Sequence, residues 1–118
     1  MKYILFAILI TVTALVSATS KPEIKLSDNQ KGLGYLSYQK AANGRNYIND
    51  RSYLGEFMLK YSSGDVVRTV KLADVKSRVL NNDTYKIEIS WFLPENIEFT
   101  QSFKVVENEI DWNIDIRN

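Results

Sequence analysis

Apolar and polar residues alternate most regularly along the C-terminal third of the chain. Residues 85–93, 97–105 and 109–117 carry apolar side chains mainly at alternate positions, with polar or charged side chains between them. A period of two is typical of a β-strand that buries one face. Turn-forming residues separate these stretches at 94–96 and 107–108. The pattern therefore predicts three consecutive antiparallel strands.

The middle of the chain has a weaker pattern of the same kind. Residues 53–61 alternate, residues 62–65 have the composition of a turn, and residues 66–72 return as the second arm of a predicted hairpin. Residues 73–80 fit either a short helical turn or a bent strand, and residues 81–83 are expected to end that element.

The N-terminal part of the chain is more ambiguous. Residues 33–38 resemble a strand, but residues 35–42 followed by Asn43 and Gly44 also fit two helical turns with a glycine stop. We favour the strand. Residues 20–32 are polar and are expected to form the least ordered part of the chain, as an arm that either pairs as an edge strand or stays unpaired.

Strands with one apolar face need a cover for that face. A second sheet is the simplest cover, so we predict an all-β fold, a small antiparallel β-sandwich of immunoglobulin-like size. The alternative is an α+β fold, in which an antiparallel meander packs on one helix.

The first eighteen residues have the pattern of a secretory signal peptide. Lys2 precedes an apolar run over residues 3–16, and Ser17 and Ala18 provide a small-residue exit. Fourteen helical residues reach about 21 Å, which is short of the roughly 30 Å of bilayer hydrocarbon. We therefore expect cleavage near Ala18, no stable membrane span, and a single β-rich domain over residues 19–118 that is secreted or periplasmic.

Composition narrows the chemistry. The chain contains no cysteine and no histidine, so a Ser–His or Cys–His nucleophile and the usual nitrogen and sulfur ligands of zinc are absent. A cysteine-free exported domain is more typical of bacteria than of animal extracellular modules. The fifteen basic and fourteen acidic residues of the chain nearly balance. So small a net charge does not favour nucleic acid as a partner. We expect no enzyme activity, no cofactor and no metal.

Two catalytic patterns remain to be weighed. Ser37 and Lys40 have the S-x-x-K spacing of penicillin-recognising enzymes, but the match covers four residues and is attributed to chance. Glu95 and Glu98, with Trp91 as an aromatic platform for a sugar, would suit a carboxylate-dependent glycan hydrolase. We keep this hydrolase as a second alternative.

Acidic residues gather on the last predicted strand. Glu109, Asp111 and Asp115 share its polar face. One strand does not supply the six to eight oxygens that calcium needs. The charges are therefore interpreted as protection of a terminal strand against aggregation, with recognition of a partner as the alternative.

Tyrosine, arginine and asparagine are concentrated in residues 35–53. This composition is typical of recognition loops, because tyrosine offers rigid amphipathic surface and arginine offers directional donors. The alternative is that the tyrosines lie across the rim of the sandwich. The predicted partner-binding residues are Tyr38, Arg45, Tyr47, Arg51 and Tyr53.

These observations favour an exported, non-enzymatic protein that binds another protein or a cell-surface macromolecule. A periplasmic inhibitor, an immunity-type protein and an assembly accessory factor are examples of this class. The first alternative is a structural subunit of a surface filament or coat, a homo-oligomer whose edge strands pair with the next copy.

Overall fold

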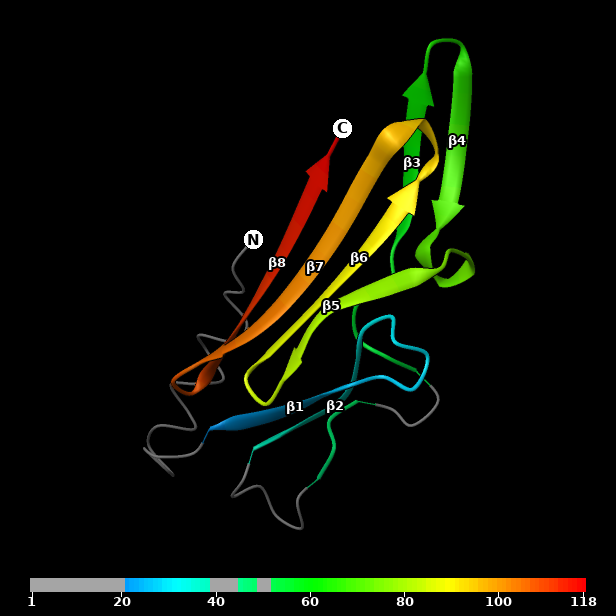
Figure 1. The fold of residues 1–118 in the computed structure, drawn as a ribbon. Coiled ribbons are helices and arrows are strands. Elements are labelled where there is room, and N and C mark those ends of the chain that lie inside the picture. The colour runs from blue at the N-terminus through cyan, green and yellow to red at the C-terminus, as the bar shows by residue number, and fades with distance from the viewer. Residues whose placement is uncertain (1–20, 39–44, 49–51) are drawn as a thin grey trace.

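The computed structural model describes residues 21–38, 45–48 and 52–118, which form eight β-strands and two short 3-10 helices (Figure 1). The predicted leader, residues 1–18, lies outside the described residues. Each strand pairs antiparallel with a strand next to it in the sequence. In chain order the elements are β1 (Pro22–Leu26), β2 (Leu33–Tyr38), β3 (Met58–Ser63), β4 (Val66–Lys71), η2 (Leu72–Asp74), β5 (Ser77–Asp83), β6 (Lys86–Leu93), η3 (Pro94–Asn96), β7 (Ile97–Val106) and β8 (Glu109–Arg117).

The largest sheet contains four strands in the order β5-β6-β7-β8. The predicted C-terminal strands are confirmed as β6, β7 and β8, with turns at residues 94–96 and 107–108. Tyr85, which was expected on the buried face of β6, lies in the preceding turn and is exposed, so that placement is wrong. The side chains of β6 that do fill this face are Ile87, Ile89, Trp91 and Leu93.

A short helical turn and a bent strand were the two alternatives predicted for the segment before β6, and the segment contains both in succession. A single turn of 3-10 helix, η2, is followed by the irregular strand β5, whose register against β6 shifts between Val79 and Asn81. Residues 81–83 were expected to end this element but instead form its last paired residues. Pairing with β6 has therefore overridden the turn-forming preference of asparagine and aspartate.

The N-terminal arm is part of the fold. β1 and β2 form a hairpin, so the arm pairs as an edge strand, which is one of the two alternatives expected for it, and Ile24 on β1 is buried in the core. The hydroxyl of Ser27 accepts hydrogen bonds from the backbone N–H groups of Lys31 and Gly32, which orders the connecting loop. The strand interpretation of residues 33–38 is confirmed, and residues 39–42 lie outside the described residues.

The predicted middle hairpin is present as β3 and β4, joined at Gly64 and Asp65. Its first strand begins at Met58, five residues later than expected. Gly55 has a φ of 108°, which breaks an extended strand, and Leu54 forms an isolated bridge with Leu33 instead. The expected start of the strand is therefore wrong, because residues 53–57 cross from one hairpin to the other.

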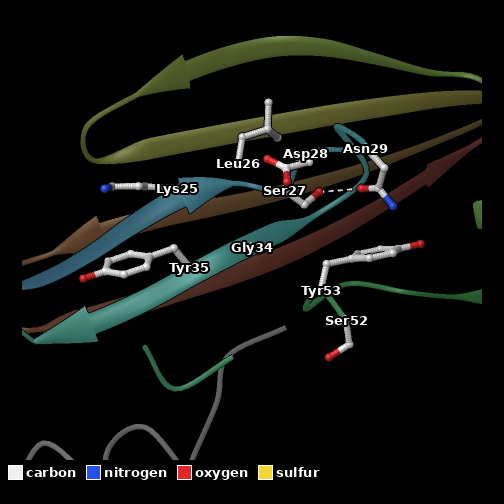
Figure 2. A pocket seen from close by; sticks show the side chains of 9 residues that line it. All are labelled: Lys25, Leu26, Ser27, Asp28, Asn29, Gly34, Tyr35, Ser52 and Tyr53. Carbon is white, nitrogen blue, oxygen red and sulfur yellow. Dashed lines mark hydrogen bonds between the residues drawn. The ribbon is translucent and has the colours of Figure 1, made fainter. Parts of the chain in front are cut away.

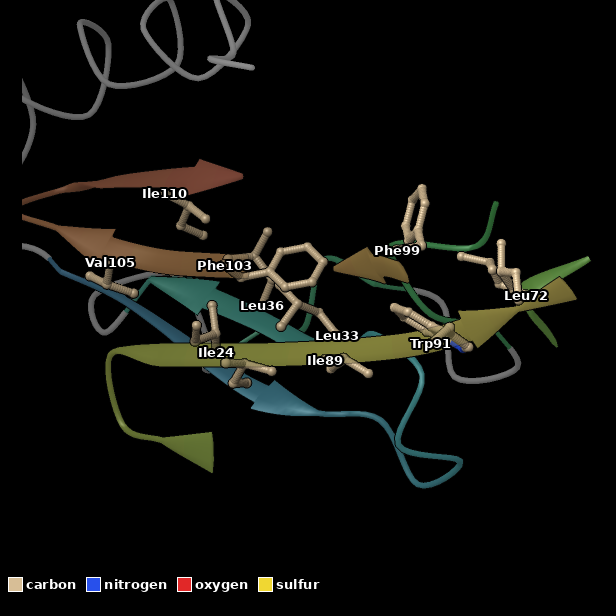
Figure 3. Packing of buried hydrophobic residues seen from close by; sticks show 12 residues of the cluster. Ile24, Leu33, Leu36, Leu72, Ile89, Trp91, Phe99, Phe103, Val105 and Ile110 are labelled. Carbon is tan, nitrogen blue, oxygen red and sulfur yellow. The ribbon is translucent and has the colours of Figure 1, made fainter. Parts of the chain in front are cut away.

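The two hairpins cover one face of the four-stranded sheet. Figure 1 shows β1 and β2 crossing one end of the sheet and β3 and β4 rising beside the other end. Figure 3 shows the shared core, in which Ile24, Leu33 and Leu36 from the first hairpin meet Ile89, Phe103 and Ile110 from the sheet.

The protein is all-β, with antiparallel sheets packed together as a small β-sandwich. The immunoglobulin-like part of the prediction is not confirmed, because the strand pairings join sequence neighbours, whereas immunoglobulin sandwiches have Greek-key connections. The helical elements among the described residues are two 3-10 helices of three residues each, so the α+β alternative is not supported.

Candidate functional site

The segment 45–48 is bonded to the free edge of β2. The backbone N–H of Tyr47 donates to the carbonyl of Leu36 at 2.8 Å. The side chain of Asn46 accepts from the N–H groups of Leu36 and Ile48, both at 3.0 Å, and donates to the carbonyl of Gly34 at 3.1 Å. One asparagine therefore satisfies three backbone groups and fixes this loop on the strand.

Three of the predicted partner-binding residues come together on this loop and the end of β2. The guanidinium of Arg45 lies 5.9 Å from the ring centre of Tyr47, within range of a cation–π interaction. The Tyr47 ring meets the Tyr38 ring edge-on at 6.4 Å. Tyr47 is 55% exposed and Tyr38 only 7%, so Tyr38 supports Tyr47 from below. We call these three residues the Tyr47 cluster.

The Tyr38 hydroxyl is buried and has no hydrogen-bond partner among the described residues. Burial is the main cause that raises the pKa of this phenol above 10.0, and Tyr47 and the Glu109 carboxylate add to the effect. Glu109 is the first residue of β8. The charge at the start of the last strand therefore acts on the phenol beneath Tyr47.

The other two predicted partner-binding residues are not part of this cluster. Arg51 lies outside the described residues. Tyr53 is half-buried beside an open groove of about 410 Å³ on the outward face of the first hairpin (Figure 2). Burial is the main cause that raises the pKa of the Tyr53 phenol, and the charge of Glu56 adds to the effect.

The groove has a mixed apolar and polar lining. In Figure 2, Tyr35 and Tyr53 lie on either side of Gly34, and the Lys25 ammonium is 4.7 Å from the ring centre of Tyr35. A Cβ at Gly34 would approach the Cα of Ser27 to 2.8 Å, so this position requires glycine. The lining residues are Lys25, Leu26, Ser27, Asp28, Asn29, Gly34, Tyr35, Ser52 and Tyr53.

The carboxylates considered for glycan hydrolysis have structural partners. The Nε of Arg68 lies 2.8 and 2.7 Å from the two carboxylate oxygens of Glu95, and Glu98 accepts a hydrogen bond from the hydroxyl of Ser90 at 3.1 Å. Trp91 has no exposed surface, so it cannot serve as the expected platform for a sugar. The burial of Trp91 therefore excludes the sugar platform that the hydrolase hypothesis assigned to this residue.

The remaining chemical signals are weak in the part of the chain that the structure describes. Ser37, the serine of the S-x-x-K match, is 2% exposed, and Lys40 is not among the described residues. The described residues contain no group of three or more acidic side chains placed to hold a metal ion. No helix in this described part of the chain is long and apolar enough to cross a membrane.

Two residues that organise the structure were missed from the sequence. Asn46 was counted only as part of a polar loop, although asparagine readily bonds the backbone two residues ahead, as it does here with Ile48. Gln101 lies on the buried face of β7 with no exposed surface. Its place in an otherwise apolar alternation was the available signal for a buried hydrogen-bonding residue.

Comparison of the chain with protein-family models, curated proteins and solved structures finds no significant match.

Proposed function

We propose that the protein is exported, is not an enzyme, and binds another macromolecule through the exposed side of the Tyr47 cluster. The observation that carries this proposal is the contrast at Tyr47: the ring is 55% exposed, while its backbone is bonded to β2 and its neighbour Asn46 is bonded three times. Apolar ring surface is thus held outward on a fixed backbone.

A fixed aromatic residue is favourable for binding. Tyrosine and arginine are enriched among the residues that contribute most to interfaces, and a loop that is already ordered loses less entropy on association. The Arg45 guanidinium beside the Tyr47 ring adds donors that suit a carboxylate or carbonyl group of a partner. The site is therefore suited to recognition of a protein or a cell-surface polymer.

Export is supported by the sequence of residues 1–18, with its single lysine, apolar run and small-residue exit. The absence of enzyme activity is supported by residue types, since the chain lacks cysteine and histidine. Export has a direct test: N-terminal sequencing of the protein recovered from the producing cells should begin near Thr19, and intact precursor in the cytosol would contradict export.

Binding is tested by crosslinked capture from native extract with a tagged chain. Arg45→Ala with Tyr47→Ala should reduce the recovery of the captured partner by tenfold or more, because loss of an anchor residue costs about 2 kcal/mol. The matched control is Arg78→Ala with Tyr85→Ala, which removes the same two residue types from exposed positions on β5 and the following turn.

Comparison of the Tyr47 double variant with its matched control distinguishes the possible results of the capture experiment. Loss of capture in the Tyr47 variant alone supports the proposed site. Equal capture by both variants and the unmodified chain would reject the Tyr47 cluster as the binding surface, and failure of the unmodified chain to capture any partner would count against the binding function.

A further inference from the structure

We propose that β4 pairs antiparallel with β4 of a second copy of this chain, so that the two β3–β4 hairpins join into one four-stranded sheet with Thr69 at the two-fold axis. Such a pair uses the same surface on both copies and closes at two chains. The pairing is independent of the binding proposed at the Tyr47 cluster, which lies on other elements.

The outer edge of β4 carries no backbone partner in the part of the chain that the structure describes. Residues 66–71 pair with β3 in a continuous register, and the two strands form a sheet of their own. Figure 1 shows β4 on the side of this hairpin away from the four-stranded sheet. The free edge of β2, in contrast, is bonded to Tyr47, and β5 has a register shift. A regular open edge is a template for another strand.

The composition of β4 favours pairing. Four of its six residues are β-branched, and it contains neither proline nor glycine. Val66 and Val67 are 52% and 62% exposed. A two-stranded hairpin is only marginally stable by itself, whereas four strands support one another. A second copy of β4 would therefore add main-chain hydrogen bonds and cover exposed valine side chains.

Two-fold symmetry restricts the register. An antiparallel pair that keeps the same faces on the same side of the sheet must place one residue of β4 opposite itself. Centring on Arg68 would set two guanidinium groups directly opposite each other, which is destabilising. Centring on Thr69 makes a favourable threonine pair at the axis. It also places Val67 opposite Lys71 and Arg68 opposite Val70. Centres nearer either end of the strand would pair fewer residues.

The other cations of the hairpin tolerate this register. Lys60 lies opposite Thr69 within each hairpin, so the two copies of Lys60 would be three strand spacings apart, about 14 Å. Salt screens exposed charges beyond about 8 Å. The two copies of Arg68 would be diagonal neighbours. The Nε of each, however, lies 2.8 and 2.7 Å from the carboxylate oxygens of Glu95 in its own chain.

An open pocket lies where the second copy would place an exposed valine. The pocket has a volume of about 270 Å³ and is lined by Glu56, Phe57, Met58 and Lys71. Val67 of the second copy would lie opposite Lys71, at the edge of this pocket, and the symmetry repeats the contact. Val67 and Met58 would thus lose apolar exposed surface around the stem of the lysine.

A single engineered cysteine tests the register, because the chain contains no cysteine. Thr69→Cys would bring two Cα atoms to about 5 Å, within the range of a disulfide. Val67→Cys is the matched control on the same face of β4, since its two copies would be about 14 Å apart along the strands. We expect Thr69→Cys to form a disulfide-linked dimer at least tenfold faster than Val67→Cys under a mild oxidant, as measured by non-reducing electrophoresis.

Sedimentation velocity of the purified chain tests the association itself. Two short strands form an interface at the small end of the known range, so the concentration is varied from about 1 μM to about 1 mM. Thr69→Lys sets two ammonium groups opposite each other and should weaken the dimer at least tenfold. Thr84→Lys makes the same replacement at an exposed turn between β5 and β6, and should change the affinity by less than about twofold.

Several results would overturn the proposal. These are a chain that stays monomeric throughout this range, equal cross-linking at both cysteine positions, and an affinity that Thr69→Lys weakens no more than Thr84→Lys does. Growth beyond a dimer would also overturn it, because a two-fold pair closes at two chains. Circular dichroism of each variant shows that it is folded, and capture of a partner through the Tyr47 cluster is measured separately and stands or falls without the dimer.

Discussion

The indole Nε1 of Trp112 on β8 donates a 3.0 Å hydrogen bond to the side-chain Oε1 of Gln101 on β7. Gln101 has no exposed surface, and its Nε2 donates to the carbonyl of Gly55 at 2.7 Å. The Trp112 ring also stacks on Phe103, with 5.4 Å between ring centres. A single buried amide therefore joins two strands of the sheet to the segment that leads into β3.

Gln101→Leu tests the contribution of this amide. The substitution keeps a side chain of roughly similar size but leaves the indole N–H of Trp112 and the carbonyl of Gly55 without their partner. We expect the free energy of unfolding to fall by about 2–4 kcal/mol, since each unsatisfied buried group costs about 1–3 kcal/mol. Urea unfolding followed by circular dichroism measures the change.

A double-mutant cycle separates the hydrogen bond from packing. Trp112→Phe removes the indole N–H, so in the Gln101→Leu background it should cost less than it does alone. Additive costs would show that the bond between Gln101 and Trp112 contributes nothing to stability.

Ile24→Ala tests whether the N-terminal hairpin belongs to the cooperative fold. Ile24 is 3% exposed and packs in the same cluster as Leu36 and Ile110. Removal of a fully buried isoleucine side chain should lower the free energy of unfolding by about 2–4 kcal/mol. Lys25→Ala, on the exposed position next to it, should change it by less than about 1 kcal/mol. If Ile24→Ala lowered the free energy of unfolding no more than Lys25→Ala does, the hairpin would not be part of the cooperatively folded core.

The elements that were predicted correctly are those whose pattern is local. The period of two along β6, β7 and β8 follows from burial of one face, and it needs no knowledge of which residues cover that face. The pairing of β1 was left open because the strand has only five residues, two of them charged, and because the Ser27 hydroxyl orders a loop that has no strand or helix pattern of its own. Ile24 and Leu26 do alternate with Glu23 and Lys25, but so short an alternation does not by itself predict a strand, and it does not predict the hydrogen bonds of Ser27.

The candidate site was predictable in composition but not in arrangement. The surplus of tyrosine and arginine identified the region, and the structure brings Arg45, Tyr47 and Tyr38 together. Tyr53 lies elsewhere because the next residue, Leu54, forms a bridge with Leu33 at the start of β2. That bridge is a tertiary contact, and no local pattern in the sequence encodes it.

Asn46→Ala tests whether the loop is held in advance of binding. The substitution removes all three side-chain hydrogen bonds to Gly34, Leu36 and Ile48, so amide hydrogen exchange at Tyr47 should become faster while the core strands remain protected. We expect partner affinity to fall several-fold, although the side chains of Arg45 and Tyr47 are unchanged.

Asn46→Asp provides the matched control for that prediction. It retains the oxygen that accepts from Leu36 and Ile48 but loses the amide that donates to Gly34, so its effect on exchange should be intermediate. Unchanged exchange at Tyr47 in Asn46→Ala would show that the hydrogen bond from Tyr47 to Leu36 suffices to hold the loop.

Tyr38→Phe tests the buried hydroxyl under the Tyr47 cluster. Because this hydroxyl has no partner among the described residues, its removal should leave stability at pH 7 unchanged or raise it by up to about 1 kcal/mol. Burial raises the pKa of Tyr38 in the folded protein above the ordinary value of 10.0. Above pH 10 the unfolded chain therefore releases this proton before the folded protein does, and stability falls as the pH rises.

The phenylalanine variant should lose this part of the alkaline dependence. Urea midpoints measured at pH 8 and pH 11 should differ less for Tyr38→Phe than for the unmodified protein, whereas Tyr85→Phe, at an exposed position, should retain the full difference. An identical alkaline loss in all three proteins would show that Tyr38 titrates in the folded state as it does in the unfolded chain, and that the hydroxyl beneath Tyr47 is reached by water.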